Sequence, residues 1–276
     1  MRWRDIRTGL TVVTYPTFEP VSRAEAKLHC RIDHADEDHL IDGFISAARR
    51  QLEKDTARTP VNTVYDLAIE RFPEERYIEV PRLPLASVAS VTSYDEDDAA
   101  TVMSSGDYRV DTATGRIVLN DDATWPSDLR RHNAGVIRFT AGPNGSSKSI
   151  STLTSTGTAP NVTATATTGA AHGLSTGDLV TIVGAGEDAY NGTFVITVTG
   201  ATTFTYGVVS GTPATTATGT ITARLLNVSP SHRLAMLLLI EHFWRNRGAT
   251  VEEAASELPL GYCALIGGSD RVYAMA

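Results

Sequence analysis

The chain has 276 residues, and its content of 42% hydrophobic and 20% charged residues is typical of a folded, soluble globular protein. A formal net charge of −8 disfavours broad binding to nucleic-acid phosphates, because such binding needs clustered Lys and Arg. The two cysteines, Cys30 and Cys263, are too few for a disulfide framework or a tetrahedral metal set. We expect no signal peptide and no membrane span, since no apolar run is long enough.

Residues 1–21 are predicted to be an extended lead-in. Tyr15 precedes Pro16 and Glu19 precedes Pro20, and a residue before proline favours extended backbone. Such an arm can pack on its own domain or on a neighbouring subunit.

Two helices joined by an acidic turn are predicted over residues 22–58. Ser22 and Glu25 have the spacing of a reciprocal capping box at the start of the first helix. The second begins near Asp36, and its apolar residues recur every three or four positions to form one stripe: Leu40, Ile41, Phe44, Ile45, Ala48 and Leu52. Arg49 and Glu53 are expected off this stripe, and the β-rich remainder is expected to supply a surface that covers it.

Short strands follow the helical pair. Residues 62–72 alternate between polar and apolar, which predicts a half-buried strand. Further strands are predicted at residues 77–81, 85–94 and 135–141, and a hairpin at 108–111 and 116–119 about a turn that contains Gly115. Residues 95–100 are predicted to form a polar turn.

The composition changes at residue 145. Up to residue 223 the chain has four charged residues, while Thr, Gly, Ala and Val dominate. Strands are predicted at 179–183, 193–198, 203–209 and 219–223, which indicates an all-β sandwich or barrel module. The Ser- and Thr-rich leader at 146–168 suits a flexible linker or an edge strand.

A third helix is predicted after Ser229, which is a good N-cap before Pro230 at the first helical position. It is apolar over much of its surface, so we expect it to be buried against the first two helices and to end at Gly248. Residues 258–261 are predicted to be a turn and 262–276 a short terminal segment. The expected fold class is therefore α+β. One discontinuous domain of residues 1–144 and 225–276 combines a helical core with short antiparallel strands, and 145–224 is an inserted all-β domain.

No catalytic, metal or cofactor site is predicted. His29, Cys30, His34 and His39 lie close in sequence, but they lack the spacing of a zinc site. The acidic run of Asp95, Glu96, Asp97 and Asp98 lacks the glycine and spacing of a calcium loop, and a solvated hairpin tip is the better interpretation. The basic residues Arg130, Arg131, His132 and Arg138 are expected to pair with the acidic excess on the surface.

The fragments of this sequence resemble one family in a collinear order. They are VSRAEAKLHCRIDHADEDHLIDGFISAARRQLEKDTART, then IEVPRLPLASVASVTSYDEDD, GDYRVD, GRIVL, WPSDL and VIRFTAG, and finally PSHRLAMLLLIEHFWRNRG and ELPLGYCALI. Together they cover most of residues 20–144 and 228–268, and the set is similar to the head–tail connector (adaptor) proteins of long-tailed double-stranded DNA phages. The stretch 145–225 departs from the short family members and resembles the small β domains inserted into many phage virion proteins.

This resemblance implies a non-enzymatic, structural protein of the virion neck that is made in the host cytoplasm. Family members assemble as twelve-fold rings, dock on the portal, extend the DNA channel and receive a stopper or tail-completion protein. We expect a net negative lumen that lets double-stranded DNA slide without sequence-specific binding. The chain ends, 1–20 and 264–276, are expected to contact partners, through Asp270, Arg271 and Tyr273 at the C-terminal end.

Three other functions stay open at this point. The first is a receptor- or glycan-binding module in the β insertion, to which the aromatic residues Tyr190, Phe204 and Tyr206 would contribute. Against it, these residues alternate with Val and Thr as core residues do. The second is a metal enzyme that uses the acidic run at 95–98. The third is another ring protein on the tail side of the neck.

Overall fold

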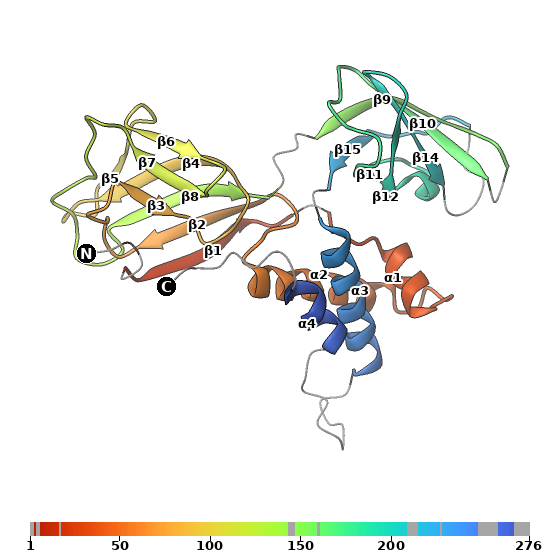
Figure 1. The fold of residues 1–276 in the computed structure, drawn as a ribbon, viewed down its shortest axis with the longest axis horizontal. Coiled ribbons are helices and arrows are strands. Elements are labelled where there is room, and N and C mark those ends of the chain that lie inside the picture. Colours follow the sequence, from red (N-terminus) through yellow and green to blue (C-terminus); the bar gives the residue numbers. More distant parts are fainter. Residues whose placement is uncertain are drawn as a thin grey trace. The chain divides into compact units, whose positions relative to one another are not determined.

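The computed structural model describes residues 3, 6–16, 18–142, 147–158, 161–208, 215–226, 228–247 and 259–267. The chain divides into two compact units. The first unit combines Met1–Phe18 with Thr56–Asn144, and the second combines Glu19–Asp55 with Gly145–Ala276. Figure 1 shows the strands of the first unit in red to light green and the helices of the second mainly in red, orange and blue.

The first unit contains two antiparallel sheets that share one core. The five-stranded sheet has the order β1-β2-β8-β4-β5 and the three-stranded sheet the order β3-β7-β6. Their bounds are β1 Thr8–Thr14, β2 Thr63–Ile69, β3 Tyr77–Glu79, β4 Leu85–Tyr94, β5 Ala100–Val102, β6 Tyr108–Asp111, β7 Arg116–Leu119 and β8 Gly135–Ala141. The predicted strands at 62–72, 77–81, 85–94 and 135–141 and the predicted hairpin are confirmed.

The alternation of buried and half-buried side chains along the strands explains how this unit packs. In β2 every second residue from Thr63 to Ile69 is buried, as the period of a strand requires when one face meets a core. Tyr65 of β2 stacks on Phe139 of β8 with ring centroids 5.5 Å apart. Ile78 of β3 and Ile117 of β7 belong to the same buried cluster as Leu67, so the two sheets bury their inner faces together.

The predicted lead-in contains a strand. β1 pairs with β2 in antiparallel register from Thr8 opposite Ile69 to Val12 opposite Tyr65, and the register shifts before Thr14. Trp3 and Ile6 join the core of the same unit. The two X-Pro pairs that suggested an arm lie beyond this strand, which is why proline spacing did not reveal it.

Among the described residues of the second unit, four α-helices pack around one apolar core. They are α1 Arg23–Cys30, α2 Asp38–Thr56, α3 Pro230–Arg245 and α4 Leu260–Gly267. Ile41, Ile45, Ala48 and Leu52 of α2 share this core with Ala235, Met236, Leu239 and Ile240 of α3. The predicted burial of the third helix against the first two is thus confirmed. The expectation that strands cover the α2 stripe is wrong, because the apolar faces of α3 and α4 already supply the partner surface.

The two predicted serine N-caps are formed, but the second half of the predicted capping box is not. Ser22 Oγ accepts a hydrogen bond of 3.2 Å from the Glu25 amide, and Ser229 Oγ accepts one of the same length from the His232 amide. The predicted return bond from Glu25 to Ser22 is replaced by a tertiary contact. The Glu25 carboxylate instead accepts a 2.6 Å hydrogen bond from Arg233 of α3.

The C-terminal turn predicted at 258–261 is wrong where the structure describes it. Leu260 begins α4, and Tyr262 in its first turn is fully buried in the helical core. Burial of this one large aromatic side chain stabilises a helix too short to persist alone. Gly248 lies outside the described residues.

The β insertion forms a seven-stranded antiparallel sheet with the order β12-β11-β15-β9-β10-β14-β13. The bounds are β9 Lys148–Thr156, β10 Val162–Thr168, β11 Leu179–Val183, β12 Gly192–Val195, β13 Thr197–Val198, β14 Thr203–Val208 and β15 Thr222–Leu225, with a short 3-10 helix η2 at Asp188–Tyr190. The predicted linker or edge strand at 146–168 is wrong, because β9 and β10 are interior strands. Val162, Ala164 and Ala166 face the core of the module while the intervening threonines face outward.

Candidate interaction surface of the helical bundle

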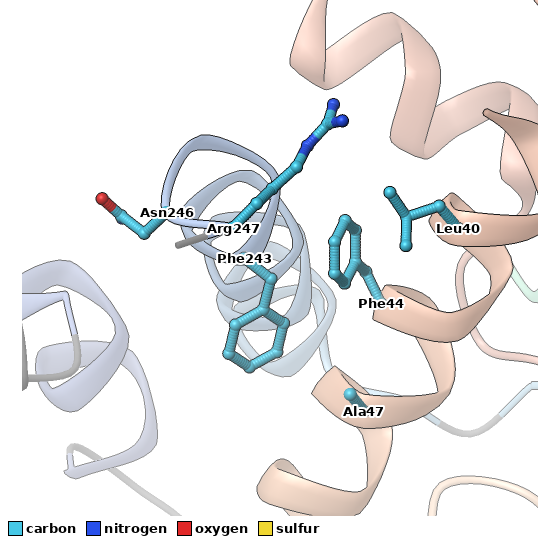
Figure 2. A pocket seen from close by; sticks show the side chains of 6 residues that line it. All are labelled: Leu40, Phe44, Ala47, Phe243, Asn246 and Arg247. Carbon is cyan, nitrogen blue, oxygen red and sulfur yellow. The ribbon is translucent and has the colours of Figure 1, made fainter. Parts of the chain in front are cut away.

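An open pocket of about 360 Å³ lies between α2 and α3 of the second unit. Leu40, Phe44 and Ala47 of α2 line one side, and Phe243 of α3 with Asn246 and Arg247 just beyond its end line the other. Figure 2 shows the rings of Phe44 and Phe243 between the two helices. Their centroids are 6.2 Å apart and the planes are tilted by 42°.

Helical periodicity places the lining residues. Leu40, Phe44 and Ala47 are spaced by four and three, so they follow one edge of the α2 stripe. Phe243 and Arg247 are four residues apart at the C-terminal end of α3. The sequence placed Phe44 on the apolar stripe of the second helix and predicted a buried third helix, to which Phe243 belongs, but it did not show that the two helices leave a recess. That recess depends on how two helices about 200 residues apart meet.

At the charged edge of the pocket, Arg247 forms an ion pair with Glu37. Both Arg247 guanidinium nitrogens Nη1 and Nη2 donate to the Glu37 carboxylate, the second at 3.2 Å, and the guanidinium carbon lies 3.7 Å from the Trp244 ring centroid. The hydrogen bonds from Arg247 lower the pKa of Glu37. The six lining residues include no carboxylate, histidine, cysteine or hydroxyl group. The recess therefore has the chemistry to hold an apolar side chain, and none of its lining groups is a nucleophile or a base.

A buried ionic cluster lies on another face of α2. Arg49 is 4% exposed and donates to Glu19 Oε2 at 2.7 Å and to Glu53 Oε1 at 2.9 Å. Ser46 Oγ donates to Glu19 Oε1 at 2.9 Å. Burial acts to lower the pKa of Arg49, but the hydrogen bonds and charges of Glu19 and Glu53 together outweigh it, and the pKa is raised. Arg49 and Glu53 lie off the apolar stripe, as expected, but their face of α2 is buried as well. Glu19 provides a second carboxylate for the buried guanidinium, which offsets the cost of burying it.

The acidic run at 95–98 forms a turn between β4 and β5. Asp95 Oδ1 accepts from the amides of Asp97 and Ala99 at 3.0 and 2.8 Å, so it caps the turn. Asp98 pairs with Arg130 at 2.8 Å. The prediction of a solvated hairpin tip is confirmed. Among the described residues no group of three or more His, Cys, Asp or Glu is placed to hold a metal ion.

The predicted surface pairing of the basic residues is confirmed for three of the four. Arg130 pairs with Asp98, Arg138 with Asp66 at 2.8 Å, and His132 with Glu70 at 3.2 Å. Both cysteines are free thiols, with Cys30 half-buried and Cys263 exposed, and burial raises the pKa of the Cys30 thiol.

The aromatic residues considered for glycan binding are core residues. Tyr190 and Phe204 are fully buried and Tyr206 is 3% exposed, within the apolar cluster of the β insertion. Tyr206 Oη donates to the Tyr190 carbonyl at 3.1 Å. Asp270, Arg271 and Tyr273, the predicted partner contacts, lie outside the described residues. None of the described helices is long and apolar enough to cross a membrane.

Comparisons with known proteins identify a relationship for part of the chain. Residues 24–112 match the model of a family described as phage gp6-like head-tail connector protein. This segment runs from α1 into the β6–β7 hairpin and includes the N-terminal fragments on which the sequence resemblance rests, whereas the fragments from GRIVL onward lie outside it. No curated protein matches the chain.

Solved structures share the fold. A chain in the structure described as "Virion of native gene transfer agent (GTA) particle" has a TM-score of 0.51 at 17% identity. Chains in "Neck of native GTA particle computed with C12 symmetry" and "Neck of empty GTA particle computed with C6 symmetry" both have TM-scores of 0.50, at 18% and 17% identity. Each match covers 94% of this chain and 93% of the other. At identities this low, the structural matches show a common fold over nearly the whole chain and nothing beyond the fold.

Proposed function

We propose that this chain, which over residues 24–112 belongs to the phage gp6-like head-tail connector family, is a structural protein of a virion neck. The family match carries the proposal. Its segment coincides with α1, α2 and most of the first sheet unit, so the shared part is folded structure rather than a short motif. The fold shared with chains of gene transfer agent necks and virions supports the same role and the same location.

The connector assembles as a ring of identical copies. Support comes from the fold match to a neck determined with C12 symmetry, together with the family resemblance, which implies twelve copies. In this proposal residues 1–144 and 225–276 form the connector domain, and 145–224 is an insertion carried on it. The portal protein lies on one side of the ring, and a stopper or tail-completion protein lies on the other.

Double-stranded DNA passes through the channel of this ring without sequence-specific contacts. The net charge of −8 supports this, because a wall with few free cations retains few phosphates. Two of the accessible arginines, Arg130 and Arg138, already pair with carboxylates, those of Asp98 and Asp66. An assembled ring with a channel lined by unpaired Lys and Arg would contradict this part of the proposal.

The C-terminal end contacts the portal through Asp270, Arg271 and Tyr273. The structure sharpens the test of this assignment. Leu265 and Ile266 pack against the helical core, so a truncation that begins at residue 264 would damage the bundle as well. A chain that stops after Gly267 keeps these contacts. We expect it to fold with unchanged helical content and to lose portal binding; full retention of binding would discard the assignment.

The deciding experiment measures mass and symmetry of the purified full chain. Light scattering and negative-stain imaging would be carried out on the chain alone and with the portal protein of the same particle. A ring or a portal-bound complex is expected. A chain that stays monomeric and does not bind the portal would refute the neck function. The glycan-binding alternative loses its main support, since Tyr190, Phe204 and Tyr206 are buried.

A further inference from the structure

The two edges of the five-stranded sheet carry no charged residue. β1 has the sequence TGLTVVT and β5 the sequence ATV. Within the part of the chain that the structure describes, each pairs with one neighbour, β1 with β2 and β5 with β4. Val13 is 42% exposed and Val102 is 63% exposed. Edge strands of soluble proteins are usually protected by charged side chains, prolines or a covering element. These two strands have no charge and no proline, and their exposed positions include valines.

The backbone groups at both edges are arranged for pairing. The Glu70 amide donates to the Arg7 carbonyl, which makes Arg7 and then Gly9 and Thr11 the residues whose backbone groups face β2. Thr8, Leu10 and Val12 therefore direct their amides and carbonyls to the open side. In the same way the amide of Met103 donates to Val91 and that of Asp95 to Ala99, so Ala100 and Val102 face outward.

The direction of the strands limits how the edges can meet. Four antiparallel pairings separate β1 from β5 in the sheet, so these two strands point the same way. Neighbours in a ring of many copies differ by a small rotation, which leaves strand directions nearly unchanged. β5 of one copy would therefore meet β1 of the next in parallel. A two-fold dimer would instead bring β1 against β1, antiparallel.

We infer that the open edges of β1 and β5 pair with each other between successive copies of this chain, which joins their five-stranded sheets around the ring. The partner is a second copy, because the chain itself carries both halves of this head-to-tail contact at opposite ends of one sheet. The pairing is parallel and uses the outward groups of Thr8, Leu10 and Val12 against those of Ala100 and Val102. It rests on the proposed ring and specifies which surfaces close it.

Thiol crosslinking of the full chain tests the pairing. In a background with Cys30 and Cys263 changed to serine, T11C and V102C are made singly and together and treated with a short bismaleimide, with and without portal. The double variant is expected to give a ladder of multimers, and a mixture of the two single variants a dimer. The matched control combines T11C with V195C, since Val195 is 62% exposed on a strand of the β insertion. No ladder in either condition, or an equal ladder from the control, would overturn the inference.

A proline variant separates this contact from ring formation in general. V102P removes an outward amide donor and leaves the residues that face β4 intact, whereas V102A keeps the donor. We expect V102P to fold, to weaken self-association and to suppress the ladder of a T11C chain with A100C, while V102A does neither. A strong crosslink from T11C alone would indicate a two-fold β1 contact and contradict the inference. Rings that form normally with V102P would refute the edge pairing but leave the neck function standing.

Discussion

Tyr262 Oη donates a 2.6 Å hydrogen bond to Asp55 Oδ2, which ties the first turn of α4 to the last turn of α2 across 207 residues of sequence. Tyr262 is fully buried, while Asp55 lies at the surface. The ring of the tyrosine thus fills the core and its hydroxyl reaches a solvated carboxylate. This arrangement holds the C-terminal helix on the bundle.

Removing the hydroxyl of Tyr262 and removing its whole ring should lower the free energy of unfolding by different amounts. Y262F loses one hydrogen bond and leaves Asp55 solvated, so we expect a loss of about 1 kcal/mol in unfolding free energy. Y262A also empties the core position and should cost about 3–5 kcal/mol. Urea unfolding followed by the helical circular dichroism signal would measure both. Equal losses for the two variants would show that the ring contributes nothing to the core.

Because of the Tyr262 hydroxyl, we expect the free energy of unfolding to depend on pH in the alkaline range. Burial, with the hydrogen bond and charge of Asp55, raises the pKa of Tyr262 above its ordinary value of 10.0. Below pH 10 the side chain is protonated in both states and its contribution is complete. Above it the unfolded chain releases the proton and the folded chain does not, so stability falls as pH rises. The difference between the natural chain and Y262F should therefore shrink above pH 10; a constant difference would contradict the assignment.

The buried guanidinium of Arg49 predicts a large cost for removing its charge. R49M leaves Glu19 and Glu53 facing each other with no cation between them, and breaking a buried pair in this way costs about 3–5 kcal/mol. The neutral combination E19Q, R49M and E53Q should recover much of that loss. Chemical denaturation of the three chains measures the effect.

Arg23 supplies the control for Arg49. It also binds two carboxylates, with Nε 2.8 Å from Asp42 Oδ1 and Nη1 3.3 Å from Asp38 Oδ2, but its side chain is 48% exposed. Water and salt screen such a pair, so R23M should cost less than about 1 kcal/mol. If R23M and R49M were equally mild, the Arg49 cluster would not be acting as a buried pair.

Local patterns predicted much of this fold. Ser22 and Ser229 marked helix starts because each hydroxyl needs only an amide three residues away. The partner of Glu25 could not be read locally, because Arg233 lies 208 residues further along and its proximity depends on how α1 meets α3. The pocket between Phe44 and Phe243 has the same origin.

The sequence patterns of β1, β10 and α4 did contain evidence for these elements, although the composition of the segments suggested other structures. In β10, Val162, Ala164 and Ala166 alternate with threonines, which is the period of a strand with one buried face. The high Ser and Thr content of 146–168 suggested a linker, but β-branched threonine also suits the solvated face of a sheet. For β1 the uncharged run before Tyr15 was the signal, and for α4 it was the single buried Tyr262.

The aromatic pair in the helical pocket should show measurable coupling. The rings of Phe44 and Phe243 lie 6.2 Å apart in a tilted arrangement, for which double-mutant cycles give about 0.5–1.5 kcal/mol beyond burial. The cycle uses F44A, F243A and the double variant in urea unfolding. Pairing F44A with F194A in the β insertion is the control, because separate clusters should be additive. Additivity of the first cycle would mean that the two rings do not interact.

Gly184 is the glycine of the β insertion whose substitution should be most costly. Its φ of +90° lies in the left-handed region, and a Cβ there would come within 2.1 Å of the Thr220 carbonyl oxygen, a backbone atom that cannot swing aside. G184A must move the segment that follows β11 away from the segment that precedes β15, so we expect a loss of more than about 2 kcal/mol. Gly207 in β14 has open space where its Cβ would lie, and G207A should stay within about 0.5 kcal/mol of the natural chain. Thermal unfolding and limited proteolysis compare the two. Equal resistance to protease would mean that the turn at Gly184 adapts without strain.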